Sequence, residues 1–285
     1  MAPIGLVMEG GAMRGLFTAG ILDVFMENGV EFPAAVGVSA GAAFGCNLKS
    51  RQQGRALRYN KRFCRDKRYC SLRSLLKTGD LYGADFCYRE IPEKLDVFDK
   101  EAYEQNPMAF YVVATDVYTG EPVYKRLDKV DENCYLWMRA SASMPMVSKP
   151  VKVEGYTLLD GGMSDAIPLR FLQDKGYEKN VVILTRARDY VKQPADRLML
   201  KTVLHQYPAM IDVMIRRHKM YSFEREYVFA SERQGNTFVL CPDQPLCVAH
   251  TEKDPDKLQA AYDEGRKVAL RELDRIKEFM ESDNR

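Results

Sequence analysis

The feature that most constrains this chain is the pentapeptide Gly37-Val38-Ser39-Ala40-Gly41, which overlaps the end of the apolar run 34–38. The run predicts a buried strand, and the small residues after Ser39 predict the start of a helix. A serine on so tight a strand-to-helix turn exposes its hydroxyl, and the flanking Gly37 and Gly41 leave room for close backbone packing. A small-residue turn that only packs a helix on a sheet has the same pattern. The rest of the chain is therefore needed to distinguish a reactive serine from such a turn.

A second strand–turn–helix unit precedes the pentapeptide. Residues 4–8 are apolar and lead into Glu9-Gly10-Gly11-Ala12-Met13-Arg14-Gly15, and a helical apolar pattern follows as far as Asn28-Gly29. A glycine loop between a strand and a helix presents free backbone N–H groups, which suit an anion. The spacings of a nucleotide P-loop and of a dinucleotide loop are both absent. The other use of such a loop is an oxyanion hole.

A third segment supplies a carboxylate. Residues 156–159 predict a short strand that ends in Asp160-Gly161-Gly162. That tripeptide could be only a turn, but an activated serine needs a base, and a carboxylate beside it can serve. The small residues at 139–145 are typical of a segment that packs under a site.

The glycine loop, the pentapeptide, the small residues at 139–145 and Asp160-Gly161-Gly162 follow one another along the chain. Together and in this order, these four segments resemble the patatin-like phospholipases over about residues 4–185. The resemblance implies that Ser39 is the nucleophile and Asp160 its base in a Ser–Asp dyad. It also implies a role for several other residues: the amides of Gly10, Gly11 and Ala12 as the oxyanion hole, Arg14 as a brace of the loop that helps to orient an anionic head group, and Gly15, Gly37, Gly41, Gly161 and Gly162 as supporting glycines.

The chain departs from the family pattern at Ala12, where a third glycine is most common. Alanine keeps its N–H, so the donor survives unless the backbone there needs a positive φ.

The resemblance implies a serine acyl hydrolase that cleaves ester bonds of lipids or phospholipids and degrades lipid, with no metal and no organic cofactor. Two alternatives remain open: a short-chain carboxylesterase or thioesterase with the same dyad, and a catalytically silent lipid-binding protein. An acyltransferase is less favoured, because Val38 fills the position beside the serine.

A histidine-assisted triad is the rival arrangement, since Ser39, Asp160 and His250 follow the chain order of the α/β-hydrolases. However, His250 follows a proline-rich loop without supporting glycines, and Ser39 comes after only one strand–helix unit. His205 and His218 fall in a long helical stretch and are interpreted as surface or packing residues.

Strands alternate with helices in the first two-thirds of the chain, with further strands expected at 110–115, 122–124, 151–153 and 181–184. The alternation predicts an α/β fold of three layers, α/β/α, around a mostly parallel central sheet. We expect a catalytic core at 1–190 and a mainly helical C-terminal part at 191–285 that packs on this core, with helices at about 196–233 and 255–281.

The composition is that of a globular protein, with 46% hydrophobic and 29% charged residues, and a net charge of +2 gives no reason to expect a nucleic-acid partner. The seven cysteines form no C-x-x-C pair, and no metal-ligand cluster is visible. No apolar run approaches the ~20 residues of a membrane span, and no signal peptide is visible. We therefore expect a cytoplasmic protein that contacts membranes peripherally.

Residues 49–73 are strongly basic, with Asp66 as the single acid and aromatic residues in between. Such a segment can bind anionic lipid head groups, or it can be a solvated helix face. The first interpretation makes Arg55, Arg58 and Arg62 the predicted contacts with an anionic membrane surface.

Overall fold

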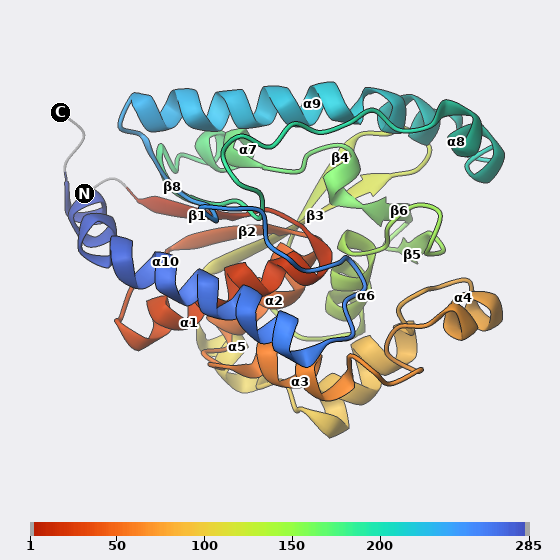
Figure 1. The fold of residues 1–285 in the computed structure, drawn as a ribbon, viewed down its shortest axis with the longest axis horizontal. Coiled ribbons are helices and arrows are strands. Elements are labelled where there is room, and N and C mark those ends of the chain that lie inside the picture. The colour runs from red at the N-terminus through yellow and green to blue at the C-terminus, as the bar shows by residue number, and fades with distance from the viewer. Residues whose placement is uncertain (1–2, 283–285) are drawn as a thin grey trace.

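The computed structural model describes residues 3–282 and builds them around one mixed sheet (Figure 1). The strand order is β5-β6-β3-β2-β1-β7-β8, and β4 also pairs with β3. The strands are β1 (Ile4–Met8), β2 (Ala34–Val38), β3 (Ala109–Asp116), β4 (Pro122–Arg126), β5 (Val151–Val153), β6 (Tyr156–Asp160), β7 (Lys179–Ile183) and β8 (Thr237–Leu240).

The centre of the sheet is parallel, because β3, β2, β1, β7 and β8 run in one direction. The antiparallel pairs are β3 with β4, β3 with β6, and β5 with β6. Every residue of β1, β2 and β7 is buried, as expected for parallel strands that helices cover on both faces. The predicted three-layer α/β/α fold with a mostly parallel sheet is therefore confirmed.

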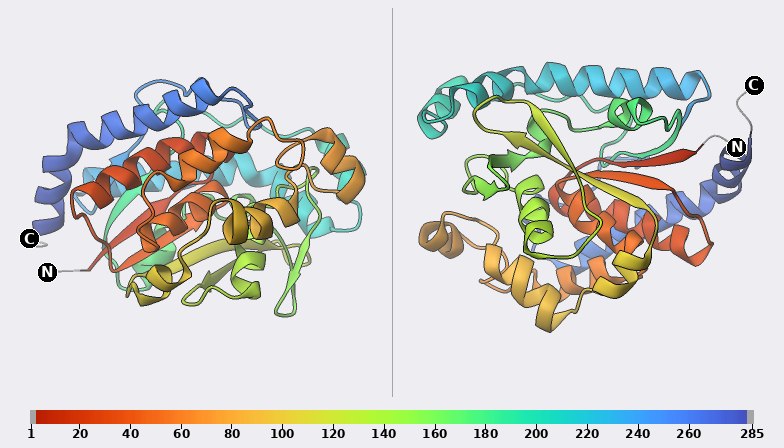
Figure 2. Two further views of the ribbon diagram at one scale, coloured as in Figure 1. Left: turned by 90° about the horizontal axis from the view of Figure 1, so that it is seen from below. Right: turned by 180° about the vertical axis from the view of Figure 1, so that it is seen from behind.

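Helices cover the two faces of the sheet in separate layers (Figures 1 and 2). One layer holds α1 (Gly15–Glu27), α2 (Ala40–Lys49) and α10 (Pro255–Glu281), and the other holds α7 (Leu169–Asp174) and α9 (Pro208–Arg233). The remaining helical segments are η1 (Ala12–Arg14), α3 (Arg55–Phe63), α4 (Leu72–Thr78), the π-helical η2 (Phe86–Leu95), α5 (Lys100–Gln105), α6 (Glu132–Ser141), η3 (Gly161–Met163) and α8 (Arg197–Val203).

Alternate residues of β1 supply the cores on the two sides of the sheet. Leu6 and Met8 pack in the cluster that contains Phe17 of α1, whereas Val7 packs in the cluster that contains Val228 of α9. This alternation follows from the two-residue period of a strand. It fixes β1 between the two helical layers, so that its carboxyl end has a defined position.

The C-terminal part contributes more than helices. It supplies β8, which extends the sheet beyond β7 and was not predicted from the sequence. The long helical stretch after residue 196 is two helices, α8 and α9, and Pro208 begins the second, where its missing N–H costs nothing. Among residues 3–282, no helix is long and apolar enough to cross a membrane.

Helices α1 and α10 cross with their backbones almost in contact. A Cβ on Gly265 would lie 2.0 Å from the Phe17 carbonyl oxygen, and one on Gly20 would lie 2.1 Å from that of Tyr262. Both crossing points involve backbone atoms, which cannot move aside as a flexible side chain can. The crossing therefore requires glycine on both helices.

We expect Gly265→Ala to lower the free energy of unfolding by about 1–3 kcal/mol, because the added methyl overpacks the crossing. Alanine is the better helix former by about 1 kcal/mol, but this gain is smaller than the cost of the clash. Urea unfolding monitored by circular dichroism measures the difference. The control Leu270→Ala, at an exposed position of the same helix, should change stability by less than about 0.5 kcal/mol. Unchanged stability of Gly265→Ala would contradict the tight crossing.

Candidate active site

Ser39 occupies a sharp turn between β2 and α2. Its φ of 55° and ψ of −119° form a backbone conformation that side chains rarely adopt, at a cost of about 1–3 kcal/mol. The Ser39 N–H donates to the Ser141 hydroxyl at 2.9 Å, and the Ser39 carbonyl accepts from the amide of Ala43 at 3.0 Å. The surroundings thus hold the strained turn and leave the Ser39 side chain partly exposed.

Asp160 lies at the end of β6 and is buried, with 3% of its surface exposed. The Gly162 amide donates to its Oδ1 at 2.8 Å, and the Ser39 side chain lies close to its carboxylate. Burial raises the pKa of Asp160, and the Ser39 side chain and the Gly162 amide lower it in part, so that the net shift is upward. The structure therefore brings together two residues that are 121 positions apart by their printed numbers, 39 and 160.

The glycine loop after β1 lies directly against the serine. A Cβ on Gly10 would lie 2.9 Å from the Ser39 Cβ. Among residues 3–282, the amides of Gly10, Gly11 and Ala12 donate to no acceptor of the chain. Three free N–H groups next to a serine hydroxyl can stabilise a negative oxygen formed there.

A buried carboxylate supports this loop from behind. Glu9 accepts hydrogen bonds from the Thr185 amide at 2.5 Å and from the Tyr221 hydroxyl at 2.5 Å. The Thr185 hydroxyl also donates to the Gly10 carbonyl at 2.8 Å. No role was predicted from the sequence for these three residues; the one available signal was an acidic side chain, Glu9, at the end of a buried strand.

The other predicted supporting glycines occupy tight positions around the turn. A Cβ on Gly41 would lie 2.3 Å from the Met8 carbonyl oxygen, and one on Gly161 would lie 2.2 Å from that of Val113. Gly15 and Gly37 are similarly close to α2, whereas a Cβ on Gly162 would meet the Asp160 carboxylate at 3.1 Å. The predicted site residues from four segments therefore converge where the parallel strands end.

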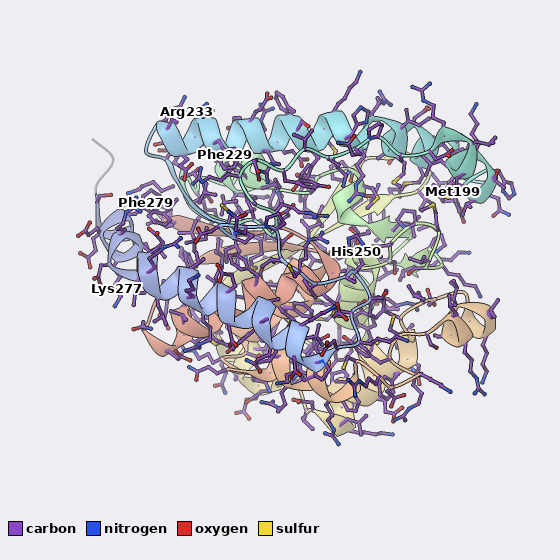
Figure 3. All side chains as sticks on the ribbon, in the orientation of Figure 1. Met199, Phe229, Arg233, His250, Lys277 and Phe279 are labelled. Carbon is purple, nitrogen blue, oxygen red and sulfur yellow. The ribbon has the colours of Figure 1, made fainter. Side chains whose placement is uncertain are left out.

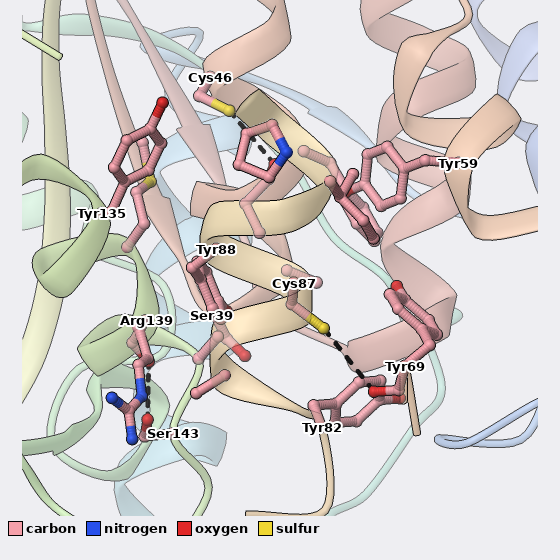
Figure 4. A pocket seen from close by; sticks show the side chains of 18 of the residues that line it. Ser39, Cys46, Tyr59, Tyr69, Tyr82, Cys87, Tyr88, Tyr135, Arg139 and Ser143 are labelled. Atoms are coloured by element: carbon pink, nitrogen blue, oxygen red, sulfur yellow. Dashed lines mark hydrogen bonds between the residues drawn. The ribbon is translucent and has the colours of Figure 1, made fainter. Parts of the chain in front are cut away.

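An apolar pocket opens at Ser39 (Figure 4). It holds about 1180 Å³ of empty space, its open mouth included. Its walls come largely from α2, α3, η2 and α6, and include Phe44, Tyr59, Tyr69, Cys87, Tyr88, Ile91 and Met138. Residues 80–98 supply much of this wall, and no part in the site was predicted for them from the sequence.

His250 does not join the Ser39–Asp160 pair. Neither of its ring nitrogens has a hydrogen-bond partner among the described residues, and only its carbonyl accepts, from the Tyr82 hydroxyl at 2.8 Å. Desolvation and the nearby charges of Arg14 and Arg186 lower the pKa of His250 to about 4. The ring is therefore neutral at pH 7 and is not oriented by a carboxylate.

One of the predicted lipid contacts on α3 needs correction. Arg55 is buried at 4% exposure, and its guanidinium donates to the Asp96 carbonyl at 2.7 Å, so its predicted contact with a membrane is wrong. Arg58 forms a two-pronged ion pair with the Asp96 carboxylate, and Arg62 donates to the Leu95 carbonyl. Both side chains remain exposed, so their contact with an anionic membrane surface stays a prediction.

The backbone at Ala12 has a positive φ of 49°. This is the left-handed region, which costs an L-residue roughly 1–2 kcal/mol and which glycine adopts freely. The condition under which alanine would disturb the loop is therefore met at Ala12, although its amide remains free.

We expect Ala12→Gly to raise the free energy of unfolding by about 0.5–1 kcal/mol, because the relief of strain exceeds the added entropy of the unfolded chain. The matched control is Ala230→Gly within α9, which should lower stability by about 1 kcal/mol. Urea unfolding of both variants gives the comparison. If Ala12→Gly is destabilised as much as the control, the backbone at this position is not strained.

Comparisons with known proteins show what this chain is similar to. A family model described as patatin-like phospholipase matches residues 6–172, and one described as a domain of unknown function matches residues 207–281. An uncharacterized protein of Escherichia coli, YjjU, is 33% identical over 196 residues, which are 64% of this chain and 52% of the relative. The lysophospholipase NTE1 of Scheffersomyces stipitis is 27% identical over 181 residues, 61% of this chain and 11% of that protein.

The chain thus spans about half the length of the first of these relatives and a small part of the second. Among solved structures, VipD from Legionella pneumophila aligns with a TM-score of 0.48 and 14% identity, over 96% of this chain and 67% of that one.

Proposed function

Because this chain belongs to the patatin-like phospholipase family, we propose that it hydrolyses ester bonds of lipids through an acyl group carried on Ser39. The observation that carries the proposal is the approach of the partly exposed Ser39 side chain to the buried Asp160 carboxylate, beside three free backbone amides. A nucleophile, a base and oxyanion donors in contact are the parts that acyl transfer requires.

In the proposed mechanism, Asp160 takes the proton of the Ser39 hydroxyl as the oxygen attacks the ester carbonyl. The carbonyl oxygen becomes an oxyanion beside the glycine-loop amides, each of which is worth on the order of 100- to 1000-fold in rate. The proton then passes from Asp160 to the leaving alcohol as the ester C–O bond breaks. A water molecule then attacks the acyl-serine and gives a proton to Asp160, which passes it to the Ser39 oxygen as the bond between that oxygen and the acyl group breaks and the fatty acid leaves.

The raised pKa of Asp160 supports its role as a base. An ordinary aspartate, with a pKa near 3.9, is a weak proton acceptor at neutral pH. Burial makes the protonated form easier to reach, so that the carboxylate accepts a proton from the serine more readily.

The apolar pocket favours a lipid over a short-chain ester. It opens at Ser39, so a chain inside it would present its carbonyl carbon to the serine. Each methylene group that leaves water for such a pocket contributes about 0.8 kcal/mol. A long acyl chain would therefore bind far more tightly than an acetyl or butyryl group.

Ser39→Ala and Asp160→Asn should each lower kcat on a chromogenic acyl ester by about 1000-fold or more. A fluorophosphonate probe should label the wild-type protein and fail to label Ser39→Ala. His250→Ala serves as the control and should keep turnover. Retained turnover in Asp160→Asn together with loss in His250→Ala would move the role of base from Asp160 to His250.

The Asp160→Asn variant should also melt no lower than the wild type. The pKa of Asp160 in the folded protein is above its unfolded value, so the folded state binds more protons and stability falls as the pH rises through that interval. At a pH above that interval, the charged carboxylate costs folding energy, and asparagine removes this cost.

We further propose that the enzyme meets lipid at the end of the molecule formed by α4 and α8. Both helices lie at one end of the long axis in Figures 1 and 2, and Figure 3 labels Met199 of α8 there. Large apolar side chains are exposed on both: Leu72 (72%), Leu76 (88%), Leu198 (77%), Met199 (47%) and Val203 (46%). The same two helices also carry exposed basic residues: Arg73, Lys77, Arg197 and Lys201.

Exposed apolar side chains with cations on the same helices fit an anionic phospholipid surface, where the apolar groups enter the head-group boundary and the cations meet phosphates. A peripheral position on the cytoplasmic side of a membrane belongs to the same proposal.

The double variant Leu72→Ser/Leu198→Ser should bind vesicles of phosphatidylglycerol and phosphatidylcholine at least about tenfold more weakly, because each buried leucine contributes about 1.5–3 kcal/mol. Co-sedimentation measures binding, and thermal melting checks the fold. Leu270→Ser, exposed on α10, should bind as the wild type does. Equal binding by the double variant would place membrane contact elsewhere.

A further inference from the structure

Four cationic side chains lie near the glycine loop and Asp160, and none of them lines the apolar pocket. This cationic cluster consists of Arg14 of η1, Arg186 and Lys192 from the loop after β7, and Arg217 of α9. Among residues 3–282, no member of the cluster forms an ion pair with a carboxylate, whereas the neighbouring Arg188 pairs with Glu232 at 2.6 Å. Cations that have no carboxylate partner, and that separate elements bring together, need an explanation.

Arg217 ties the cluster to the catalytic aspartate. Its Nε donates to the Gly162 carbonyl at 2.6 Å, and one of its terminal nitrogens would be 3.5 Å from a Cβ on Gly162. The same Gly162 donates its amide to the Asp160 carboxylate. The Arg217 guanidinium is therefore linked to the Asp160 carboxylate through Gly162.

Two tyrosines tie the rest of the cluster to the glycine loop. The Lys192 ammonium lies 5.2 Å from the centre of the Tyr221 ring, and the Arg186 guanidinium lies 4.2 Å from that of Tyr190. The two rings pack edge to face at 6.1 Å, and the Tyr221 hydroxyl bonds to Glu9 beside the loop.

Arg14 carries a buried polar atom without a partner. Its Nε is shielded from solvent and has no hydrogen-bond acceptor among the described residues. A buried donor left unpaired costs about 1–3 kcal/mol, and more when it is charged. Desolvation and the charge of Arg186 lower the pKa of Arg14, and desolvation and the charge of Arg217 lower that of Lys192 to about 8.

The local charge is positive. Three carboxyl groups, those of Glu9, Asp160 and Glu224, lie nearby, and each already accepts a hydrogen bond from a donor of the chain. Four cations against three carboxyl groups leave positive charge unbalanced. A phosphate monoester, which carries close to two negative charges at neutral pH and accepts several hydrogen bonds, has the charge and chemistry to balance it.

We propose that the cationic cluster binds the phosphate monoester of an acylated glycerol phosphate while the apolar pocket holds its acyl chain. This inference rests on the proposed function, because the ester carbonyl between the two subsites must reach Ser39. It assigns the substrate class as anionic phosphate-bearing lipids rather than neutral glycerides. Hydrolysis would release a fatty acid and glycerol phosphate.

Calorimetry on the Ser39→Ala protein tests the subsite without turnover. We expect 1-octanoylglycerol 3-phosphate to bind at least about tenfold more tightly than 1-octanoylglycerol, since charge-assisted hydrogen bonds to a phosphate are strong. Adding Arg186→Gln or Lys192→Gln should reduce this ratio to below about threefold. The matched control Arg188→Gln removes a paired, exposed arginine and should keep the full ratio. Equal binding of the two ligands to Ser39→Ala would overturn the proposal.

Inorganic phosphate distinguishes the two sources of the ligand. If it displaces the octanoyl phosphate ligand, the subsite accepts free phosphate; if it does not, the subsite takes phosphate only as part of an acyl ester. Activity is a separate outcome. Turnover of a neutral ester with equal binding of both ligands keeps the hydrolase and removes the phosphate subsite. Preferential phosphate binding by a protein without esterase activity keeps the subsite and removes the hydrolase.

Discussion

The site depends on the close approach of two backbones at the carboxyl end of the sheet. Parallel pairing of β1 with β2 sets Met8 beside Gly37, and the first turn of α2 then comes so near to β1 that a side chain on Gly41 would meet the Met8 carbonyl oxygen at 2.3 Å. The glycine loop and the serine turn therefore leave the sheet side by side. Every other part of the site is arranged around that juxtaposition.

Local patterns in the sequence predicted this centre well, because it is built from short motifs with strong backbone requirements. Strands β1 and β2 and helix α10 lie where the apolar periodicity put them. The Asp160-Gly161-Gly162 turn could be found because a carboxylate next to paired glycines at a strand end is a local signal.

Features that depend on distant partners could not be predicted. The basic pattern of α3 gave no sign that Arg55 would donate to a carbonyl 41 residues later in the chain. Strand β8 is only four residues long, and the pocket wall in η2 is a π-helix that contains Pro92, so neither has a clear periodicity. The cations Arg186 and Arg217 stand on separate elements, and only the fold shows that they share one space.

The bond between Tyr221 and Glu9 spans 212 positions of the chain. The glycine loop is therefore translated more than 200 residues before the tyrosine that holds its supporting carboxylate. The segment matched by the phospholipase family model and the segment matched by the domain of unknown function meet at this bond. During synthesis, the Glu9 carboxylate would lack its tyrosine partner until α9 has been made.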